Sequence, residues 1–259
     1  MIIGCMSCLR VLGCAGGVGG GRQSTCFLLD GVTLIDAGSG LFSLSLDELG
    51  AIQTIVLTHS HLDHVLAIPL LLDAVAASRK SPLTVYGLPQ TLAALSQHFF
   101  NGQIWPTLDE LSREGRPAVL LKEVAVGERV LADRITVLPA HHAIAACGYA
   151  IAGDSGTLIF TGDTRAGDAF WQAANRFPDL THLIIETSYL NADRELARQA
   201  YHLTAHDLAA QLGALRLNPE IFITHLKPGF ELGIMDEVFK SLGGQRKVSA
   251  LCQGAAIDF

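Results

Sequence analysis

Three histidines and one aspartate occur within seven residues of the chain, in the segment Thr58–His64. The segment follows the apolar run Ile55–Leu57, which is typical of a buried strand that ends in a turn. Imidazole and carboxylate groups are the ligands that borderline divalent metals such as zinc prefer. A histidine-rich loop can also be merely polar and exposed, but H-x-H-x-D-H directly after a strand is far more specific than a lone histidine. The segment therefore predicts a metal site.

The spacing within this segment allows one loop to serve two adjacent metal ions. His59 and His61 lie two residues apart, so an extended backbone points both imidazoles to one side. Asp63 and His64 lie where the chain turns into a helix predicted over Val65–Ser78, and there they can point elsewhere. The loop can thus contribute ligands to two positions.

Further polar residues follow apolar, strand-like runs later in the chain. The residues at or just after the ends of these runs are His141, His142, Asp163, Glu186 and His225. Each of them is weak evidence when it is taken alone. Together they predict that one edge of a sheet collects the donors that a metal site needs.

An aspartate upstream is a candidate for a supporting role. Thr25–Leu29 and Val32–Ile35 predict a hairpin around Asp30-Gly31, and the second strand ends at Asp36. A strand-end aspartate before glycine can be simple turn chemistry. It can also orient a metal-bound histidine, and we expect this second role for Asp36.

Length and composition limit the classes of function. The chain has 259 residues, 49% hydrophobic and 17% charged, which suits a compact globule, and we interpret residues 1–259 as one hydrolase domain. The net charge of −7 argues against a broad basic surface for long nucleic acid. We expect no membrane span and no signal peptide, and a cytoplasmic protein.

The first part of the chain carries two motifs that resist assignment. Cys5 and Cys8 form a single C-x-x-C, which leaves a redox pair or a stray metal site open, although reduced thiols are the default. The glycine-rich stretch Gly13–Arg22 lacks the Lys-Ser/Thr ending of a phosphate-binding P-loop. A strand rather than a helix is predicted after it, which excludes a dinucleotide fingerprint. We expect a flexible loop near the rim of the site.

Two later segments also leave alternatives open. Asn101–Pro117 is mixed in composition and is either a lid or part of an interface. His202 and His206 lie four residues apart on a predicted helix, as in H-E-x-x-H proteases, but the catalytic glutamate is missing. We expect a site role for His202 and a solvent-facing or capping role for His206.

These motifs, in this order, resemble the metallo-β-lactamase superfamily. The matching segments are Leu34–Gly38, Thr58–His64, His142, Thr161–Asp163 and Thr224-His225. The resemblance implies an α/β fold, a four-layer αβ/βα sandwich of two mixed β-sheets flanked by helices. It implies a dinuclear site at one edge of the sandwich.

The resemblance also implies which residues hold each ion. His59, His61 and His142 hold one metal; Asp63, His64 and His225 hold the other; Asp163 bridges them. His142 is preferred over its neighbour His141 because of its spacing to Gly148-Tyr149, which is similar to the spacing in the family. Zinc is the expected metal, and manganese or iron would also suit nitrogen and oxygen ligands.

Within the superfamily, two motifs are similar to those of phosphodiesterases. Glu186–Ser188 and His202–Thr204 resemble the acidic and histidine motifs of tRNA 3′-end-processing endonucleases and cyclic-nucleotide phosphodiesterases. Ile104–Pro106 and His225–Pro228 favour the cyclic-nucleotide branch. We therefore expect hydrolysis of 3′,5′-cyclic nucleotides to nucleoside monophosphates by a hydroxide that bridges two metals. The resemblance further implies a homodimer, with a small phosphodiester as substrate and no long nucleic acid.

Three catalytic roles follow from this expectation. Asp63 orients the nucleophile, and His202, held by Glu186, protonates the leaving sugar oxygen. An ordinary buried ion pair is the alternative for Glu186 and His202. The alternative functions are an RNA 3′-processing endonuclease, a thioester, lactone or β-lactam hydrolase, and a metal-supported binding protein.

Overall fold

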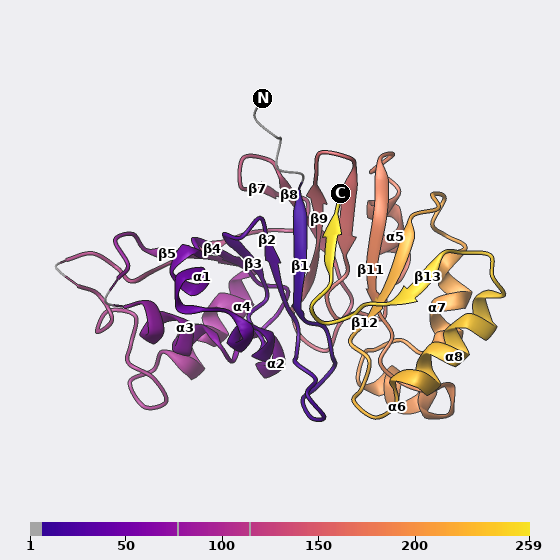
Figure 1. Ribbon diagram of the computed structural model, residues 1–259, viewed down its shortest axis with the longest axis horizontal. Helices are drawn as coiled ribbons and strands as arrows, with labels where there is room; N and C mark the ends of the chain where they lie inside the picture. Colours follow the sequence, from indigo (N-terminus) through magenta and orange to yellow (C-terminus); the bar gives the residue numbers. More distant parts are fainter. Residues whose placement is uncertain (1–6, 77, 114) are drawn as a thin grey trace.

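Two seven-stranded sheets form the centre of the molecule, and helices cover their outer faces (Figure 1). The computed structural model describes residues 7–76, 78–113 and 115–259. Cys5 lies outside these ranges, and with it the C-x-x-C motif. The arrangement is the predicted four-layer sandwich of two mixed sheets.

The first sheet is antiparallel on one side and parallel on the other. Its strands, in spatial order, are β14 (Ala256–Asp258), β1 (Cys8–Gly13), β2 (Cys26–Leu29), β3 (Thr33–Ile35), β4 (Thr54–Val56), β5 (Leu83–Gly87) and β6 (Val119–Glu123). Pairings from β14 to β3 are antiparallel, and those from β3 to β6 are parallel. All three residues of β4 are buried, as is typical of a central parallel strand.

The second sheet likewise has a parallel half and an antiparallel half. Its strands, in spatial order, are β13 (Val248–Ala250), β12 (Glu220–Thr224), β11 (Leu180–Glu186), β10 (Thr157–Phe160), β9 (Cys147–Ala152), β8 (Ile135–Pro139) and β7 (Arg129–Val130). Pairings from β13 to β10 are parallel, and those from β10 to β7 are antiparallel. Of the strands whose ends were predicted to meet, β4, β10, β11 and β12 have parallel neighbours, and β8 lies in the antiparallel half.

Each sheet has its own group of helices (Figure 1). The helices beside the first sheet are α1 (Leu46–Ala51), α2 (Leu62–Val65), α3 (Ile68–Val75) and α4 (Pro89–Ala94). Those beside the second sheet are α5 (Asp168–Ala174), α6 (Arg194–Gln199), α7 (Ala205–Leu212) and α8 (Glu231–Leu242). Two 3₁₀ turns, Ser39–Ser43 and Asn191–Asp193, and a π-helical turn at Leu95–Phe99 complete the set.

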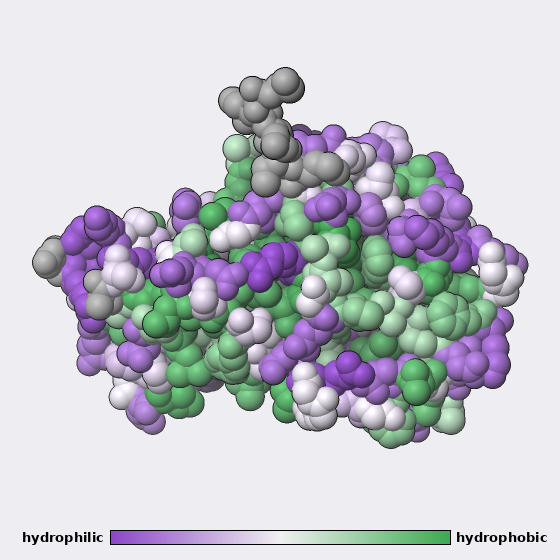
Figure 2. Space-filling model, viewed as in Figure 1, coloured by the Kyte–Doolittle hydropathy of each residue, from purple (hydrophilic) through white to green (hydrophobic). Residues whose placement is uncertain are grey.

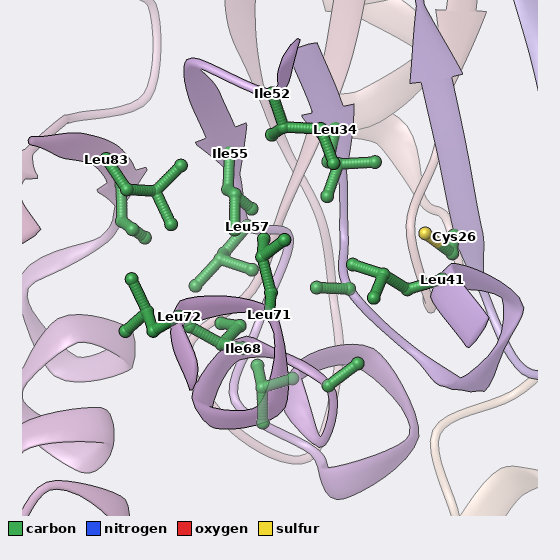
Figure 3. Packing of buried hydrophobic residues seen from close by; sticks show 14 of the residues in the cluster. Cys26, Leu34, Leu41, Ile52, Ile55, Leu57, Ile68, Leu71, Leu72 and Leu83 are labelled. Atoms are coloured by element: carbon green, nitrogen blue, oxygen red, sulfur yellow. The ribbon is translucent and has the colours of Figure 1, made fainter. Parts of the chain in front are cut away.

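Three hydrophobic clusters hold the layers together. One fills the space between the sheets, where the rings of Phe27 and Phe160 meet edge to face at 4.9 Å. The second packs α3 on the first sheet, and Figure 3 shows Ile68 and Leu71 of this helix facing Ile55 of β4. The third packs α5, α7 and α8 on the second sheet. Each fully buried Leu, Ile or Phe contributes about 1.5–3 kcal/mol.

Two elements differ from the sequence prediction. The helix expected over Val65–Ser78 is two helices, α2 and α3, because Pro69, in the first turn of α3, cannot donate the backbone hydrogen bond that would continue α2. The sequence also predicts a strand at Val124–Val126, and this prediction is wrong. β6 runs on to Glu123, and residues 124–128 form a turn in which Gly127 has φ +90°.

The surface is mixed in polarity. Figure 2 shows hydrophobic residues along the middle of one face and hydrophilic residues toward its two ends. Exposed apolar side chains include Leu46, Leu62 and Leu232. Within the described ranges, no helix has the length and apolar character needed to cross a bilayer.

Candidate metal centre

All seven predicted metal ligands come from segments that follow β4, β8, β10 and β12. α2, which contains two of these ligands, lies at the lower edge of the two sheets in Figure 1. The residues form two groups, and within each group the donor atoms lie within 4.8 Å of one another; a third, overlapping group joins Asp163 and His225 to His202. The first group is His59, His61, His142 and Asp163, and the second is Asp63, His64 and His225.

The first group brings three ring nitrogens to one point. Nδ1 of His61 lies 3.0 Å from Nε2 of His59 and 3.1 Å from Nε2 of His142. Tetrahedral zinc with bonds of about 2.0–2.1 Å separates two ligand nitrogens by roughly 3.4 Å. Burial lowers the pKa of all three imidazoles, that of His142 to about 4. At neutral pH they are therefore unprotonated and ready to bind a cation.

The second group has two imidazoles and one carboxylate. Nε2 of His225 lies 3.4 Å from Oδ2 of Asp63, and Nε2 of His64 lies 3.9 Å from the same oxygen. Burial raises the pKa of Asp63, but the hydrogen bond and charge of His225 and the charge of His64 outweigh it and lower the pKa overall. The group thus joins two imidazoles to a charged carboxylate.

Asp163 reaches both groups. Its Oδ2 atom lies 3.2 Å from Nε2 of His225, 3.4 Å from Nε2 of His64 and 3.7 Å from Nε2 of His59. Burial opposes its charge, yet His225, His64 and His59 hold the pKa of Asp163 well below its usual value. This position suits a carboxylate that bridges two cations.

His64 shows that the pocket is built for positive charge. Its Nδ1–H donates to Oδ2 of Asp36 at 2.7 Å, and its buried Nε2 has no hydrogen-bond partner among the described residues. Burial disfavours a charge here, but Asp163 and Asp36 together raise the pKa of His64 well above its usual value. A divalent cation at Nε2 would satisfy the orphaned atom and both carboxylates, so these residues fit a metal ion.

Asp36 is linked by hydrogen bonds to one histidine of each group, directly to His64 and through Thr58 to His59. It accepts hydrogen bonds from the backbone N–H and the hydroxyl of Thr58, at 2.8 and 2.7 Å, as well as from His64. The hydroxyl oxygen of Thr58 lies 3.0 Å from Nδ1 of His59. Asp36 has φ +56°, a conformation that non-glycine residues rarely adopt. The expected contact between this carboxylate and a candidate metal ligand is present.

Glu186 and His202 lie beside the two groups. Nδ1 of His202 lies 2.8 Å from Oε1 of Glu186, whose side chain is fully buried. The His202 ring contacts His142 of the first group at 5.1 Å and stacks on His225 of the second at 5.0 Å, measured between centroids. Burial lowers the pKa of His202, but the charge and hydrogen bond of Glu186 outweigh it and raise the pKa overall. Glu186 thereby favours the protonated form of an imidazole that lies between the two donor groups.

A comparison with protein families agrees with this geometry. The model of the beta-lactamase superfamily domain matches residues 33–226, which include every predicted ligand. The chain belongs to the metallo-β-lactamase superfamily. In this superfamily, the described clusters of histidine and aspartate are of the kind that holds two metal ions.

Individual relatives within the superfamily are distant. A 3′,5′-cyclic-nucleotide phosphodiesterase of Schizosaccharomyces pombe is 34% identical over 59 residues, which are 23% of this chain and only 16% of that protein. A ribonuclease Z of Bradyrhizobium diazoefficiens is 28% identical over an alignment that covers 76% of this chain and 81% of that protein. The unliganded yeast PDE1 structure superposes with a TM-score of 0.80 at 18% identity, covering 98% of this chain and 99% of that one.

Several supporting residues of this superfamily member escaped the sequence analysis. Nδ1 of His142 lies 3.2 Å from the carbonyl oxygen of Tyr201, which has φ +60°. Ser188 and Thr58 contact the imidazoles of His225 and His59 through their hydroxyls. Both hydroxyls belong to motifs that were recognised, but nothing in the motifs says which imidazole they reach.

The structure also shows where His141, His206 and the glycine-rich loop lie relative to the two donor groups. His141 and His206 are exposed and belong to neither group of donors in the described chain, as expected. The glycine-rich loop does lie at the site. Its Gly16 N–H donates to the Leu226 carbonyl at 3.0 Å, beside His225. A β-carbon on Gly16 would lie 2.7 Å from Nδ1 of His225.

Proposed function

We propose that the protein is a metal-dependent phosphodiesterase that hydrolyses 3′,5′-cyclic nucleotides to nucleoside monophosphates. The buried Glu186–His202 pair, in contact with histidines of both donor groups, carries this proposal. A ribose alkoxide that leaves phosphorus is strongly basic and needs a proton. A thiolate leaves without one, so a thioester hydrolase has little use for such a pair.

The two donor groups would hold one divalent ion each, with Asp163 between them. Zinc suits these nitrogen and oxygen donors, and manganese and iron suit them as well. Such ions, when bound, lower the pKa of water toward about 7 and neutralise charge on phosphate oxygens.

The protein's own residues then have distinct tasks. Asp63, whose side chain is 32% exposed, accepts a hydrogen bond from the attacking water and orients it. His202 donates the proton on Nε2 to the ribose oxygen as the bond between that oxygen and phosphorus breaks. Glu186 stabilises the protonated imidazole beforehand through Nδ1.

The relatives support two related substrates. The short match to curated cyclic-nucleotide phosphodiesterases and the fold of yeast PDE1 support the leading proposal. The longer match to ribonuclease Z favours RNA 3′ processing as the second candidate. The net charge of −7 argues for the smaller substrate, because long RNA is held largely through basic surface.

A substrate panel tests the proposal. The purified, metal-loaded protein is incubated with cyclic AMP, cyclic GMP, cyclic pyrimidine nucleotides, a pre-tRNA and a thioester, and products are separated by chromatography. We expect turnover of cyclic nucleotides, and a fall in kcat of about 10²- to 10⁴-fold in His202→Ala with metal content retained. Cleavage of pre-tRNA without cyclic-nucleotide turnover would establish the endonuclease instead. Thioester hydrolysis that is indifferent to His202→Ala would support the third function.

A further inference from the structure

Ser188 lies at the centre of a buried hydrogen-bond network that joins Glu186 to two histidines. Its side chain is fully buried, two residues after the end of β11. Its Oγ atom is 2.8 Å from Oε2 of Glu186, 2.8 Å from Nδ1 of His225 and 3.4 Å from Nδ1 of His202. One hydroxyl thus touches the carboxylate, a candidate metal ligand and the candidate proton donor.

The direction of each hydrogen bond follows from counting hydrogens. The backbone N–H groups of Thr164 and Leu203 donate to the two oxygens of Glu186, which therefore both act as acceptors. Ser188 has one hydroxyl hydrogen, and the short contact to Glu186 requires it. Oγ can then only accept from His225, so Nδ1 of His225 carries the proton. Nε2 of His225 faces Asp63 and Asp163 and is the ring nitrogen left to bind a metal ion.

The hydrogen bonds around Asp36 follow the same pattern as those around Glu186. Asp36 accepts directly from His64 and through the Thr58 hydroxyl from His59. Glu186 accepts directly from His202 and through the Ser188 hydroxyl from His225. Each buried carboxylate therefore serves two imidazoles, one directly and one through a hydroxyl.

We propose that Ser188 is a positioning residue for the second metal position. Its hydroxyl fixes the His225 tautomer that presents Nε2 to the metal, and it passes the negative charge of Glu186 on to that imidazole. Partners that hydrogen-bond to the far nitrogen of a ligating histidine orient the ring and raise its basicity. Ser188 acts in this way whichever ester the enzyme hydrolyses.

Metal titration of the apoprotein tests this role without any substrate. Zinc binding is measured by calorimetry, and metal content by mass spectrometry. His225→Ala, which removes a ligand, shows which of the two binding events belongs to the second position. In Ser188→Ala we expect about 10- to 100-fold weaker binding at that position, with the first position unchanged.

Two further variants separate positioning from general damage. Thr187→Val removes the neighbouring buried hydroxyl, which donates to the Glu186 carbonyl at 2.8 Å and touches no imidazole in the described structure; both affinities should stay at wild-type values. Ser188→Thr keeps a hydroxyl at the position and should recover most of the lost affinity. Equal weakening of both positions in Ser188→Ala, or no weakening at all, would overturn the proposal.

The wild-type protein provides a measurement that does not depend on whether a variant folds. Nitrogen-15 NMR of the zinc-loaded protein, with His225 assigned by its absence in His225→Ala, reports which ring nitrogen carries hydrogen. We expect a protonated, hydrogen-bonded Nδ1 on His225. A proton on Nε2 instead would contradict the assignment of Ser188.

Discussion

At the scale of single residues, the site depends on side chains that serve two partners at once. Asp163 faces both donor groups, Asp36 holds His64 and Thr58, and Glu186 holds His202 and Ser188. All three carboxylates are buried, where an unpaired charge is costly. Loss of any one of them should therefore disturb more than one neighbour.

Replacement of Asp163 by alanine tests the bridging position. Asp163→Ala leaves His64 and His225 without the carboxylate that lies within 3.4 Å of both. We expect metal affinity to fall by more than the 10- to 100-fold that is typical of an outer-sphere change, and turnover of every phosphodiester to be nearly abolished. Metal analysis and turnover are measured on the same preparation, with His141→Ala as the control. Near-normal turnover by metal-loaded Asp163→Ala would refute the assignment.

The pH dependence of turnover tests His202 as the proton donor. Glu186 raises the pKa of His202 in the folded protein, so the protonated form persists to higher pH than in a free histidine and is lost as the pH rises through this raised value. We expect kcat to fall along that alkaline limb. Glu186→Gln removes the charge that raises the pKa, so the limb should move to lower pH, and His202→Asn should lack it. If kcat fell over the same alkaline pH range in the wild type, Glu186→Gln and His202→Asn, His202 would not be the group whose deprotonation causes the fall.

Sequence alone indicated the candidate metal ligands more clearly than the residues that contact them. The ligands stand out because they are unusual residue types at strand ends, as in Thr58–His64. Ser188 does not stand out, since its partner His225 lies 37 residues further along the chain and a serine has many ordinary roles. Contacts between distant segments depend on how the sheets bring the strand ends together, and a local pattern does not contain that information.

At the scale of elements, local sequence patterns predicted the central strands but not the interruption of the helix that follows the metal-binding loop. The parallel strands β4, β10 and β12 were visible as short apolar runs. The interruption between α2 and α3 was not predicted, although Pro69 marks it. The early start of α2 matters more for the site: the helix begins at Leu62 rather than at the predicted Val65, and so it contains Asp63 and His64.

The glycine-rich loop should be intolerant of a side chain at Gly16. A β-carbon there would lie 2.4 Å from the His225 carbonyl oxygen and 2.7 Å from its Nδ1. We expect Gly16→Ala to cost about 1–3 kcal/mol of unfolding free energy through overpacking and to weaken zinc binding at the second position. Gly20→Ala is the control: none of the described atoms lies within 4 Å of its β-carbon, so it should carry only a backbone cost from φ +56°. Equal metal affinity in the two variants would show that the loop does not support His225.

Tyr149 links the second sheet to the metal-binding loop. Its hydroxyl donates to the Leu57 carbonyl at 2.6 Å, one residue before Thr58, and burial raises its pKa so that it stays protonated. Tyr149→Phe leaves that buried carbonyl with only the weak thiol donor of Cys147, at 3.6 Å, in place of the tyrosine hydroxyl, which costs about 1–3 kcal/mol. Urea denaturation measures the loss. Tyr86→Phe, at a partly exposed site, should change stability by less than about 0.5 kcal/mol, and a similarly small change in Tyr149→Phe would contradict the role given to this hydroxyl.

At the scale of the whole molecule, the candidate metal ligands are divided between the two sheets. The loops of the first sheet supply His59, His61, Asp63 and His64, and those of the second supply His142, Asp163 and His225. Neither sheet carries a complete set for both positions, so the buried cluster between the sheets is what assembles the centre. A single domain over residues 1–259 and a homodimer stay predictions, and light scattering of the purified protein tests the second.

The charge of the whole chain leads to a prediction about salt. Lys and Arg number 18 against 25 Asp and Glu, so a small substrate should be held by local charge rather than by a broad basic surface. Binding through one phosphate changes by about threefold between roughly 50 and 200 mM salt, whereas 6–10 phosphate contacts lose about 10³–10⁵ in affinity. We expect the KM for cyclic AMP to follow the shallow dependence, and pre-tRNA binding, measured over the same range, to be weak throughout. Tight pre-tRNA binding with a steep salt slope would show that long RNA is the substrate, and the cyclic-nucleotide proposal would then fail.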